Sequence, residues 1–216
     1  MNIIEIRKHL PDTVFTHDLL EGILRDKVSN INVKIANMVK KGELVRLKRG
    51  VYILGAEYRR SPLDMIGIAN VLYAPSYVSF EYALSYYGLI PERVYEITSA
   101  TSRLKKSFDT PLGRFTYRPL PPQAYAIGID WLFDERHGGR LIATPEKALC
   151  DKIRADRGIG KLSQQKLAEY LDLDLRIDMD RLYDLDSRLI LRIAEVYRSS
   201  SLKNLSKLIG KRKQSA

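Results

Sequence analysis

Apolar side chains between residues 29 and 42 recur at the spacing of a single amphipathic helix. Four of them fall at i, i+4, i+7 and i+8, namely Ile31, Ile35, Met38 and Val39. This spacing lines one face of a helix and indicates a buried stripe. Ser29 or Asn30 supplies a favourable N-cap, and Gly42 after two lysines supplies a C-terminal stop. The pattern therefore predicts a helix over residues 30–41.

The flanking residues predict two earlier helices and a later hairpin. A short first helix ends at Pro11, and Thr16 is a suitable N-cap for a second. Two short strands follow residue 42, at Leu44 to Leu47 and Val51 to Leu54, with 48–50 as a tight turn between them. Three short helices followed by a two-stranded hairpin is the order of a winged helix-turn-helix. We therefore expect such a domain over residues 1–58.

Beyond residue 60 the pattern changes to alternating helices and strands. Helix starts are expected at Ser61 to Asp64, at Ser79 and at Thr144, each with a capping residue. The expected strands are Val94 to Ile97, Phe115 to Tyr117, Tyr125 to Ile129 and Leu141 to Ala143, and Gly138 with Gly139 is expected to form a turn. This pattern predicts a larger mixed α/β domain over residues 61–216.

The last fifty residues indicate a helical end to that domain. Ser163 caps a helix that ends near Leu171, and a second helix is expected from Leu182 to Val196. Four apolar residues then define a last amphipathic helix, namely Leu202, Leu205, Leu208 and Ile209. The predicted fold class is α+β: an N-terminal winged helix-turn-helix, the mixed domain, and a helical tail over 163–216.

The charge of the chain is concentrated at its two ends. Of 36 basic and 26 acidic residues (net +10), residues 25–49 hold eight basic and two acidic ones, whereas residues 61–162 hold 13 and 11. Residues 198–213 hold six basic and no acidic residues, after an aspartate-rich stretch at 172–186. Net charge bears on partners rather than on fold, and a localised basic excess favours a nucleic-acid partner.

The basic excess near the N-terminus coincides with the two elements that a winged helix presents to DNA. Asparagine can pair with an adenine edge, and lysine or arginine can meet phosphate or guanine. The predicted DNA-binding residues are Asn30, Asn32, Lys34, Asn37, Lys40, Lys41, Arg46, Lys48 and Arg49. The alternative interpretation is that these side chains form only the solvated face of an amphipathic helix. The near absence of acids favours double-stranded DNA as the partner.

A second basic surface is also predicted, in two parts of the larger domain. Its residues are Arg103, Lys105, Lys106, Arg114, Lys211, Arg212 and Lys213. The first four belong to an expected hairpin, and the last three end the final helix. Either part could bind nucleic acid, or could only keep the surface polar.

Three segments resemble the AbiEi family of antitoxin-type transcriptional regulators. Residues 41–52 (KGELVRLKRGVY) are similar to the wing of that family, and Ser79, with the pairs 83–84 and 88–89, is similar to its next motif. Residues 142–151 (IATPEKALCD) resemble its most recognisable motif. The matches span residues 15–155. Lys147 stands where many members have arginine, and Phe80 and Tyr87 stand where histidine is frequent.

The resemblance implies a transcriptional regulator of a type IV toxin–antitoxin system. Such proteins combine an N-terminal winged helix with a C-terminal α/β domain, repress their own operon, and counteract a neighbouring nucleotidyltransferase-like toxin. Family members act without a stable toxin complex, so direct contact with a toxin is not assumed. Two alternatives stay open: a toxin-binding protein whose helix-turn-helix is only structural, and a nucleic-acid-processing enzyme built on the middle of the chain.

The sequence gives little support to an enzyme, a metal site or a cofactor. The three histidines form none of the usual ligand spacings, and no glycine-flanked serine or phosphate-binding loop is present. Four charged residues of the expected 144–156 helix weakly resemble nuclease chemistry, namely Glu146, Asp151, Lys152 and Asp156. Carboxylates on an exposed helix face are routine, and this interpretation is favoured over an enzyme. Cys150 is expected to be a small buried hydrophobe.

The location is predicted to be the cytoplasm. The longest stretch without a charged side chain is 65–80, which is 16 residues and shorter than a membrane-spanning helix requires. The first twelve residues lack the apolar core of a signal peptide. A single cysteine excludes an internal disulfide and fits a reducing compartment.

Overall fold

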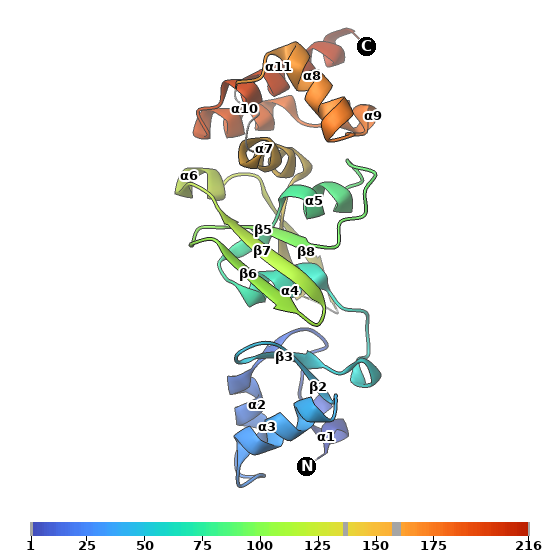
Figure 1. Ribbon diagram of the computed structural model, residues 1–216, viewed down its shortest axis with the longest axis vertical. Helices are drawn as coiled ribbons and strands as arrows, with labels where there is room; N and C mark the ends of the chain where they lie inside the picture. Colours follow the sequence, from blue (N-terminus) through green and yellow to red (C-terminus); the bar gives the residue numbers. More distant parts are fainter. Residues whose placement is uncertain (1, 136–137, 157–160, 216) are drawn as a thin grey trace.

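The computed structural model describes residues 2–135, 138–156 and 161–215, with side chains described up to residue 210. Figure 1 shows the elements stacked along the long axis of the molecule. The N-terminal helices lie at one end, a sheet lies in the middle, and the C-terminal helices lie at the other end. Helices and strands both make up large parts of the chain, so the predicted mixed α+β class is confirmed.

The N-terminal unit consists of three helices and a three-stranded antiparallel sheet. Its elements are α1 (Ile3–Arg7), β1 (Phe15–Thr16), α2 (His17–Leu24), α3 (Ile31–Lys40), β2 (Leu44–Lys48) and β3 (Val51–Leu54). The strand order is β1-β3-β2. The helices and the hairpin lie where the apolar pattern predicts them. Strand β1 was not predicted, because two residues carry no periodicity and their pairing with Val51 and Tyr52 is a tertiary contact.

Strand β3 is buried on both faces, and this joins the N-terminal unit to the rest of the chain. Tyr52 and Leu54 pack in a core with α1, α2 and α3. Val51 and Ile53 point to the opposite face and belong to the larger core, which continues as far as Ile209. Alternate residues of a strand face opposite sides, so one short strand contributes to both cores. The N-terminal sheet therefore packs directly against the middle of the molecule.

The middle of the molecule is a six-stranded mixed sheet. Its strands are β4 (Ser76–Val78), β5 (Ile97–Thr101), β6 (Lys106–Thr110), β7 (Gly113–Pro119), β8 (Ile129–Asp134) and β9 (Gly138–Ala143). The order is β6-β7-β5-β4-β9-β8. The outer strands form the antiparallel hairpins β6–β7 and β8–β9, whereas β5 with β7 and β4 with β9 run parallel.

Helices cover the sheet and build the C-terminal end. Helix α4 (Met65–Leu72) packs against β4 and β9, and α5 (Phe80–Tyr86) packs against β5 and α7 (Pro145–Ala155). Helix α10 (Ser187–Val196) packs on α7 and α11 (Ser200–Ser215). The remaining helices are the short η1 (Ala56–Tyr58), α6 (Pro122–Tyr125), α8 (Gln164–Glu169), the π-helical η2 (Tyr170–Asp174) and α9 (Met179–Asp184). Figure 1 shows α7 between the sheet and the C-terminal helices.

Two strand predictions and one turn prediction differ from the structure. The strand expected at Val94 to Ile97 begins only at Ile97, and the one expected at Tyr125 to Ile129 begins only at its last residue. Residues 122–125 are helical instead, because Pro122 occupies the first turn, where a proline is favoured. Residues 138–139 open β9 rather than form a turn, and Gly138 has a positive φ of 74°.

Two helix predictions are also corrected. The helix expected near Ser61 starts at Met65 after Asp64, so the proline at 62 precedes the helix instead of opening it. The helix expected from Leu182 to Val196 is two helices, broken at Leu185. Asp186 makes the break, because its side chain accepts a hydrogen bond from the Arg188 amide and so caps a new helix.

Candidate nucleic-acid interface

Helix α3 is fixed by its cap and by one apolar face. The Asn30 side chain accepts a hydrogen bond from the Val33 amide at 3.1 Å, which satisfies a free donor of the first turn. Ile35 and Met38 are buried against the N-terminal core. Gly42 ends the helix with a positive φ of 73°, a conformation that favours glycine.

The opposite face of α3 is open to solvent. Its exposed residues are Asn32, Val33, Ala36, Asn37 and Lys40, and Lys41 is exposed at the C-cap. Lys34 is half-buried. The side-chain oxygen of Asn30 accepts the hydrogen bond that caps the helix. Of the predicted DNA contacts on α3 and its C-cap, Asn32, Asn37, Lys40 and Lys41 therefore have exposed side chains that take no part in the N-cap or the core.

The β2–β3 hairpin brings two arginines beside α3. Leu44 and Leu47 are buried, which leaves Arg46 exposed on β2, and Arg49 is exposed in the turn. The Arg46 side chain donates a hydrogen bond to the Lys48 carbonyl at 3.3 Å, so it lies along the hairpin. The turn ends at Gly50, whose φ of 77° permits the tight reversal.

A cleft separates the hairpin from α3 and is lined by both. Its volume is about 570 Å³, and its lining residues are His17, Asn32, Arg46, Arg49, Gly50 and Tyr52. An adjoining cleft of about 290 Å³ extends along α3 past Ala36 and Val39. The structure therefore brings three of the predicted residues, Asn32, Arg46 and Arg49, to one concave surface.

His17 belongs to this surface, although the sequence did not indicate it. Its Nε2 lies 3.0 Å from the Oδ1 of Asn32, and its backbone amide donates to the Gly50 carbonyl. An amide oxygen can only accept, so the His17 ring donates and the Asn32 amide group keeps its two donors. His17 thus connects the start of α2, helix α3 and the hairpin turn. No spacing signals this, because the residues are brought together only by the fold.

Lys48 differs from its neighbours in the hairpin. Its ammonium donates to the carbonyl of Leu72 at the end of α4 and lies 5.4 Å from the centre of the Phe108 ring. Burial, and the charge of Arg103, lower the pKa of this lysine from its usual value. The hairpin therefore directs Lys48 toward the six-stranded sheet, whereas Arg46 and Arg49 line the cleft beside α3.

The residues predicted as a second basic surface lie in separate places. Arg103, Lys105 and Lys106 are exposed where the chain enters β6. Arg114 lies at the other end of that strand pair, 3.9 Å from the Asp109 carboxylate. The side chains of residues 211–213 lie outside the described residues. The structure therefore groups only the first three.

Helix α7 holds a cluster of buried charged and polar groups. Lys147 and Asp151 form an ion pair, and both are fully buried. Asp151 also accepts hydrogen bonds from the hydroxyls of Ser79, at 2.8 Å, and of Tyr197, at 2.6 Å. Burial raises the pKa of the Asp151 carboxyl, and Lys147 opposes this shift. We call these four residues the α7 polar cluster.

This cluster corrects the expectation that the charged residues of the 144–156 helix lie on an exposed face. Asp151 has no exposed surface, so its carboxylate is not free to hold a metal ion. Lys152 instead pairs with Glu81 and Asp156 at the edge of α5. Cys150 is fully buried as expected, and burial raises the pKa of its thiol.

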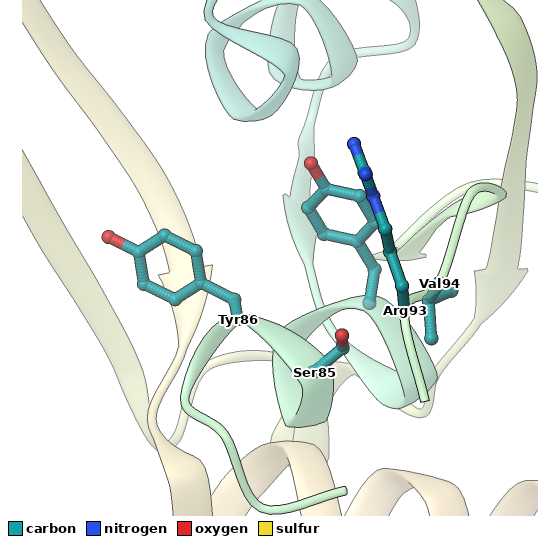
Figure 2. A pocket seen from close by; sticks show the side chains of 5 residues that line it. Ser85, Tyr86, Arg93 and Val94 are labelled. Atoms are coloured by element: carbon teal, nitrogen blue, oxygen red, sulfur yellow. The ribbon is translucent and has the colours of Figure 1, made fainter. Parts of the chain in front are cut away.

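A small pocket beside α5 offers little chemistry. It measures about 180 Å³ and is lined by Tyr82, Ser85, Tyr86, Arg93 and Val94. Figure 2 shows the Tyr86 ring turned away from Ser85 and Arg93. The Ser85 hydroxyl donates to the Glu92 carbonyl rather than to a base. The lining of this pocket therefore lacks the nucleophile–base pair that covalent catalysis requires.

One further group of possible ligands lies near the interface. Side-chain atoms of His17, Asp18 and Glu21 lie within 4.8 Å of one another at the start of α2. The His17 ring is already engaged with Asn32 and lies 3.9 Å from Glu21. The exposed carboxylates of such a helix start are common, and nothing in this group distinguishes it from them.

Neither a family model nor a curated protein matches the chain. Within the part of the chain that the structure describes, no helix is both long and apolar enough to span a bilayer.

Proposed function

We propose that this protein is a sequence-specific DNA-binding repressor in which residues 1–58 form a winged helix-turn-helix. The observation that carries the proposal is the cleft shared by α3 and the β2–β3 hairpin, which is lined by Asn32, Arg46 and Arg49. An open helix face beside a basic hairpin is the arrangement that such domains present to the major groove and the adjacent phosphates. Helix α3 contains no acidic residue that would repel a phosphate.

The contacts in this proposal have different roles. Asn37 is exposed in the middle of the open face of α3 and would read a base edge, most favourably an adenine. Asn32, with its oxygen engaged by His17, keeps only donors and would meet guanine acceptors or phosphate. The two hairpin arginines would bind backbone phosphates, which fixes the register of α3. Lys48 is left out of this contact, because its ammonium is engaged with Leu72.

The biological role in the proposal comes from the resemblance to AbiEi antitoxins. Residues 61–216 would form the antitoxin-type domain of a regulator that represses its own operon in the cytoplasm. Its functional partner would be a nucleotidyltransferase-like toxin, with or without direct contact. The alternative of a nucleic-acid-processing enzyme is less well supported. Among its candidate acidic residues, Asp151 is buried and its carboxylate is paired with Lys147.

The test is binding of the purified protein to duplex DNA from upstream of its own reading frame, compared with an unrelated duplex of equal length. We expect tighter binding to the upstream duplex. Asn37→Ala should lower that affinity roughly 5- to 150-fold, because a good bidentate base contact is worth about 1–3 kcal/mol. The Arg46→Ala, Arg49→Ala double variant should weaken binding to both duplexes and reduce its salt dependence.

A matched control removes two exposed arginines from α10, in Arg188→Ala with Arg192→Ala, and leaves the charge of the whole chain equal to that of the hairpin variant. This control should bind like the wild type. Equal affinity for the two duplexes would contradict sequence-specific recognition. Tight binding to a toxin without DNA affinity would instead support the toxin-binding alternative.

A further inference from the structure

Two aromatic rings next to the β2–β3 hairpin contact three cations, which come from that hairpin and from residues 103–106. Tyr73, after α4, and Phe108, in β6, have ring centres 6.1 Å apart. The ammonium groups of Lys48 and Lys106 lie 5.4 and 5.9 Å from the Phe108 ring, and the Arg103 guanidinium lies 5.2 Å from the Tyr73 ring. We call Lys48, Arg103, Lys106 and the neighbouring Lys105 the hairpin-side basic cluster.

Two of these cations, Lys48 and Arg103, are held by contacts with the backbone. Lys48 donates to the carbonyl of Leu72, and Arg103 donates to the carbonyl of Ala74 at 3.1 Å. The Tyr73 hydroxyl donates to the carbonyl of Leu104, which holds the loop before β6 against α4. The charges of Lys48 and Arg103 are therefore held near each other.

The positive charge of this cluster has no ion-pair partner in the part of the chain that the structure describes. Among the ion pairs found in the described residues, none includes a residue of the cluster. Burial is the main cause of the lowered pKa of Lys48, and the charge of Arg103 lowers this pKa further, as expected for two like charges that repel. Cation–π contacts offset part of this repulsion, since a ring face attracts a cation. A polyanion would relieve the rest.

The cluster adjoins the surface already proposed to bind DNA. Lys48 lies between Arg46 and Arg49 in the sequence of the β2–β3 hairpin, so this hairpin contributes side chains both to the α3 cleft and to the cluster. Figure 1 shows β6 on the side of the sheet that faces the N-terminal unit, and β2 and β6 are in contact. A duplex seated on α3 and the hairpin would therefore continue toward the loop at 103–106.

We propose that the hairpin-side basic cluster is a second DNA-binding site, which holds phosphates of the duplex next to the segment read by α3. Lys105 and Lys106, both exposed, contact the phosphates. Lys48 and Arg103 make the local electrostatic potential positive, and each donates a hydrogen bond to a backbone carbonyl. This site rests on the proposed function for its position along the DNA, but phosphate contact itself does not depend on sequence. It gives the larger domain a direct part in operator binding.

The experiment measures affinity against salt concentration for the full chain, on the upstream duplex and on the unrelated duplex. The test variant is Lys105→Ala with Lys106→Ala. The slope of log K against log salt should fall by about two in magnitude, because each lost phosphate contact removes about 0.9. The same fall is expected on both duplexes. Hydroxyl-radical footprinting should show that protection beside the α3 segment is lost, while protection of that segment stays.

The matched control is Lys166→Ala with Lys203→Ala, which removes two exposed lysines from α8 and α11 at the far end of the molecule. The net charge then equals that of the test variant. Charges separated by much more than about 10 Å are screened at 0.1 M salt, so the control should keep the wild-type slope. Circular dichroism and thermal unfolding establish that both variants are folded.

The outcomes separate the two proposals. A smaller salt slope in the test variant, with an unchanged slope in the control, supports the second site. Equal binding of the wild type to both duplexes, with no effect of Asn37→Ala, would overturn sequence-specific recognition but not the second site. An unchanged slope, or an equal change in the control, overturns the second site and leaves the proposed function standing. No binding of either duplex at low salt overturns both.

Discussion

Helices α3 and α7 have nearly the same length and both contain lysines, yet the structure gives those lysines opposite environments. In α3, of ten residues, only Ile35 and Met38 are buried, and Lys40 is exposed. In α7, of eleven residues, six are buried, and they include Lys147 and Asp151. The difference lies in what covers each helix. Helices α5 and α10 both pack on α7, whereas α3 leaves one face open.

This difference shows how the environment decides what a charged side chain can do. The Lys147 ammonium has its charge matched by Asp151 and contacts the Tyr197 hydroxyl at 3.1 Å, so it holds α7 and α10 together. The cations around α3 have no such covering layer, and only a partner from outside can meet their charge. A buried ion pair is therefore evidence about structure, and an uncovered basic surface is evidence about partners.

The largest expected effect of a single substitution on stability is in α7, the helix that α5 and α10 cover. Asp151→Ala removes the acceptor of Lys147, Ser79 and Tyr197 together and leaves a buried ammonium without a counter-charge. We expect a loss of about 3–5 kcal/mol in the free energy of unfolding, measured by urea denaturation. Glu195→Gln, an exposed change on α10, is the control and should unfold like the wild type.

A double substitution tests whether the loss comes from the uncompensated charge. Lys147→Met with Asp151→Leu removes both members of the pair and fills similar volume, so it should recover part of the stability lost in Asp151→Ala. Recovery stays partial because the hydroxyls of Ser79 and Tyr197 lose their acceptor. If Asp151→Ala alone unfolds at the wild-type urea concentration, the cluster does not contribute as described.

Among the helical residues of α3, those on its apolar face should contribute most to stability. Ile35 is 3% exposed, and truncation in Ile35→Ala should lower the free energy of unfolding by about 2–5 kcal/mol, because it leaves a cavity in the N-terminal core. Val33 is 53% exposed on the other side, and Val33→Ala should change stability by no more than about 0.5 kcal/mol. Equal losses in the two variants would contradict a single buried face of α3.

The sequence predicted α3 and the β2–β3 hairpin well, because the signals are local. Apolar spacing, the Asn30 cap and the glycine at 42 all act within a few residues, and the structure has each of them in place. The same holds for the helix start at Thr144, whose side chain accepts from the Lys147 amide. Cap and turn chemistry is local physics, so one sequence suffices to find it.

The environment of each polar residue could not be predicted in the same way. Ser79 is 72 residues from Asp151, and Tyr197 is 46 residues away, so no periodicity links them. The engagement of Lys48 with Leu72, across 24 residues, likewise depends on how the hairpin packs on the sheet. Sequence patterns indicate which face of a helix is apolar, but not whether a second layer covers the polar face.

The smallest expected effects are at the N-caps of α3 and α7, and they sharpen the comparison because only α3 is proposed to bind DNA. Asn30→Ala and Thr144→Ala each remove one side-chain acceptor from a first helical turn. Each should lower the free energy of unfolding by about 0.5–2 kcal/mol in urea denaturation. Fraying of α3 also misplaces Asn32 in the cleft, so Asn30→Ala should weaken binding to the upstream duplex, whereas Thr144→Ala should not.

Asn30→Ser separates the cap from any direct contact of residue 30 with DNA, because serine caps a helix about as well as asparagine. It should restore both stability and affinity if residue 30 acts through the helix start. Restored stability with affinity still low would mean that the Asn30 amide itself contacts the duplex. An equal loss of affinity in Thr144→Ala would contradict the division between the open and the covered helix, since α7 has no exposed base-reading face to disturb.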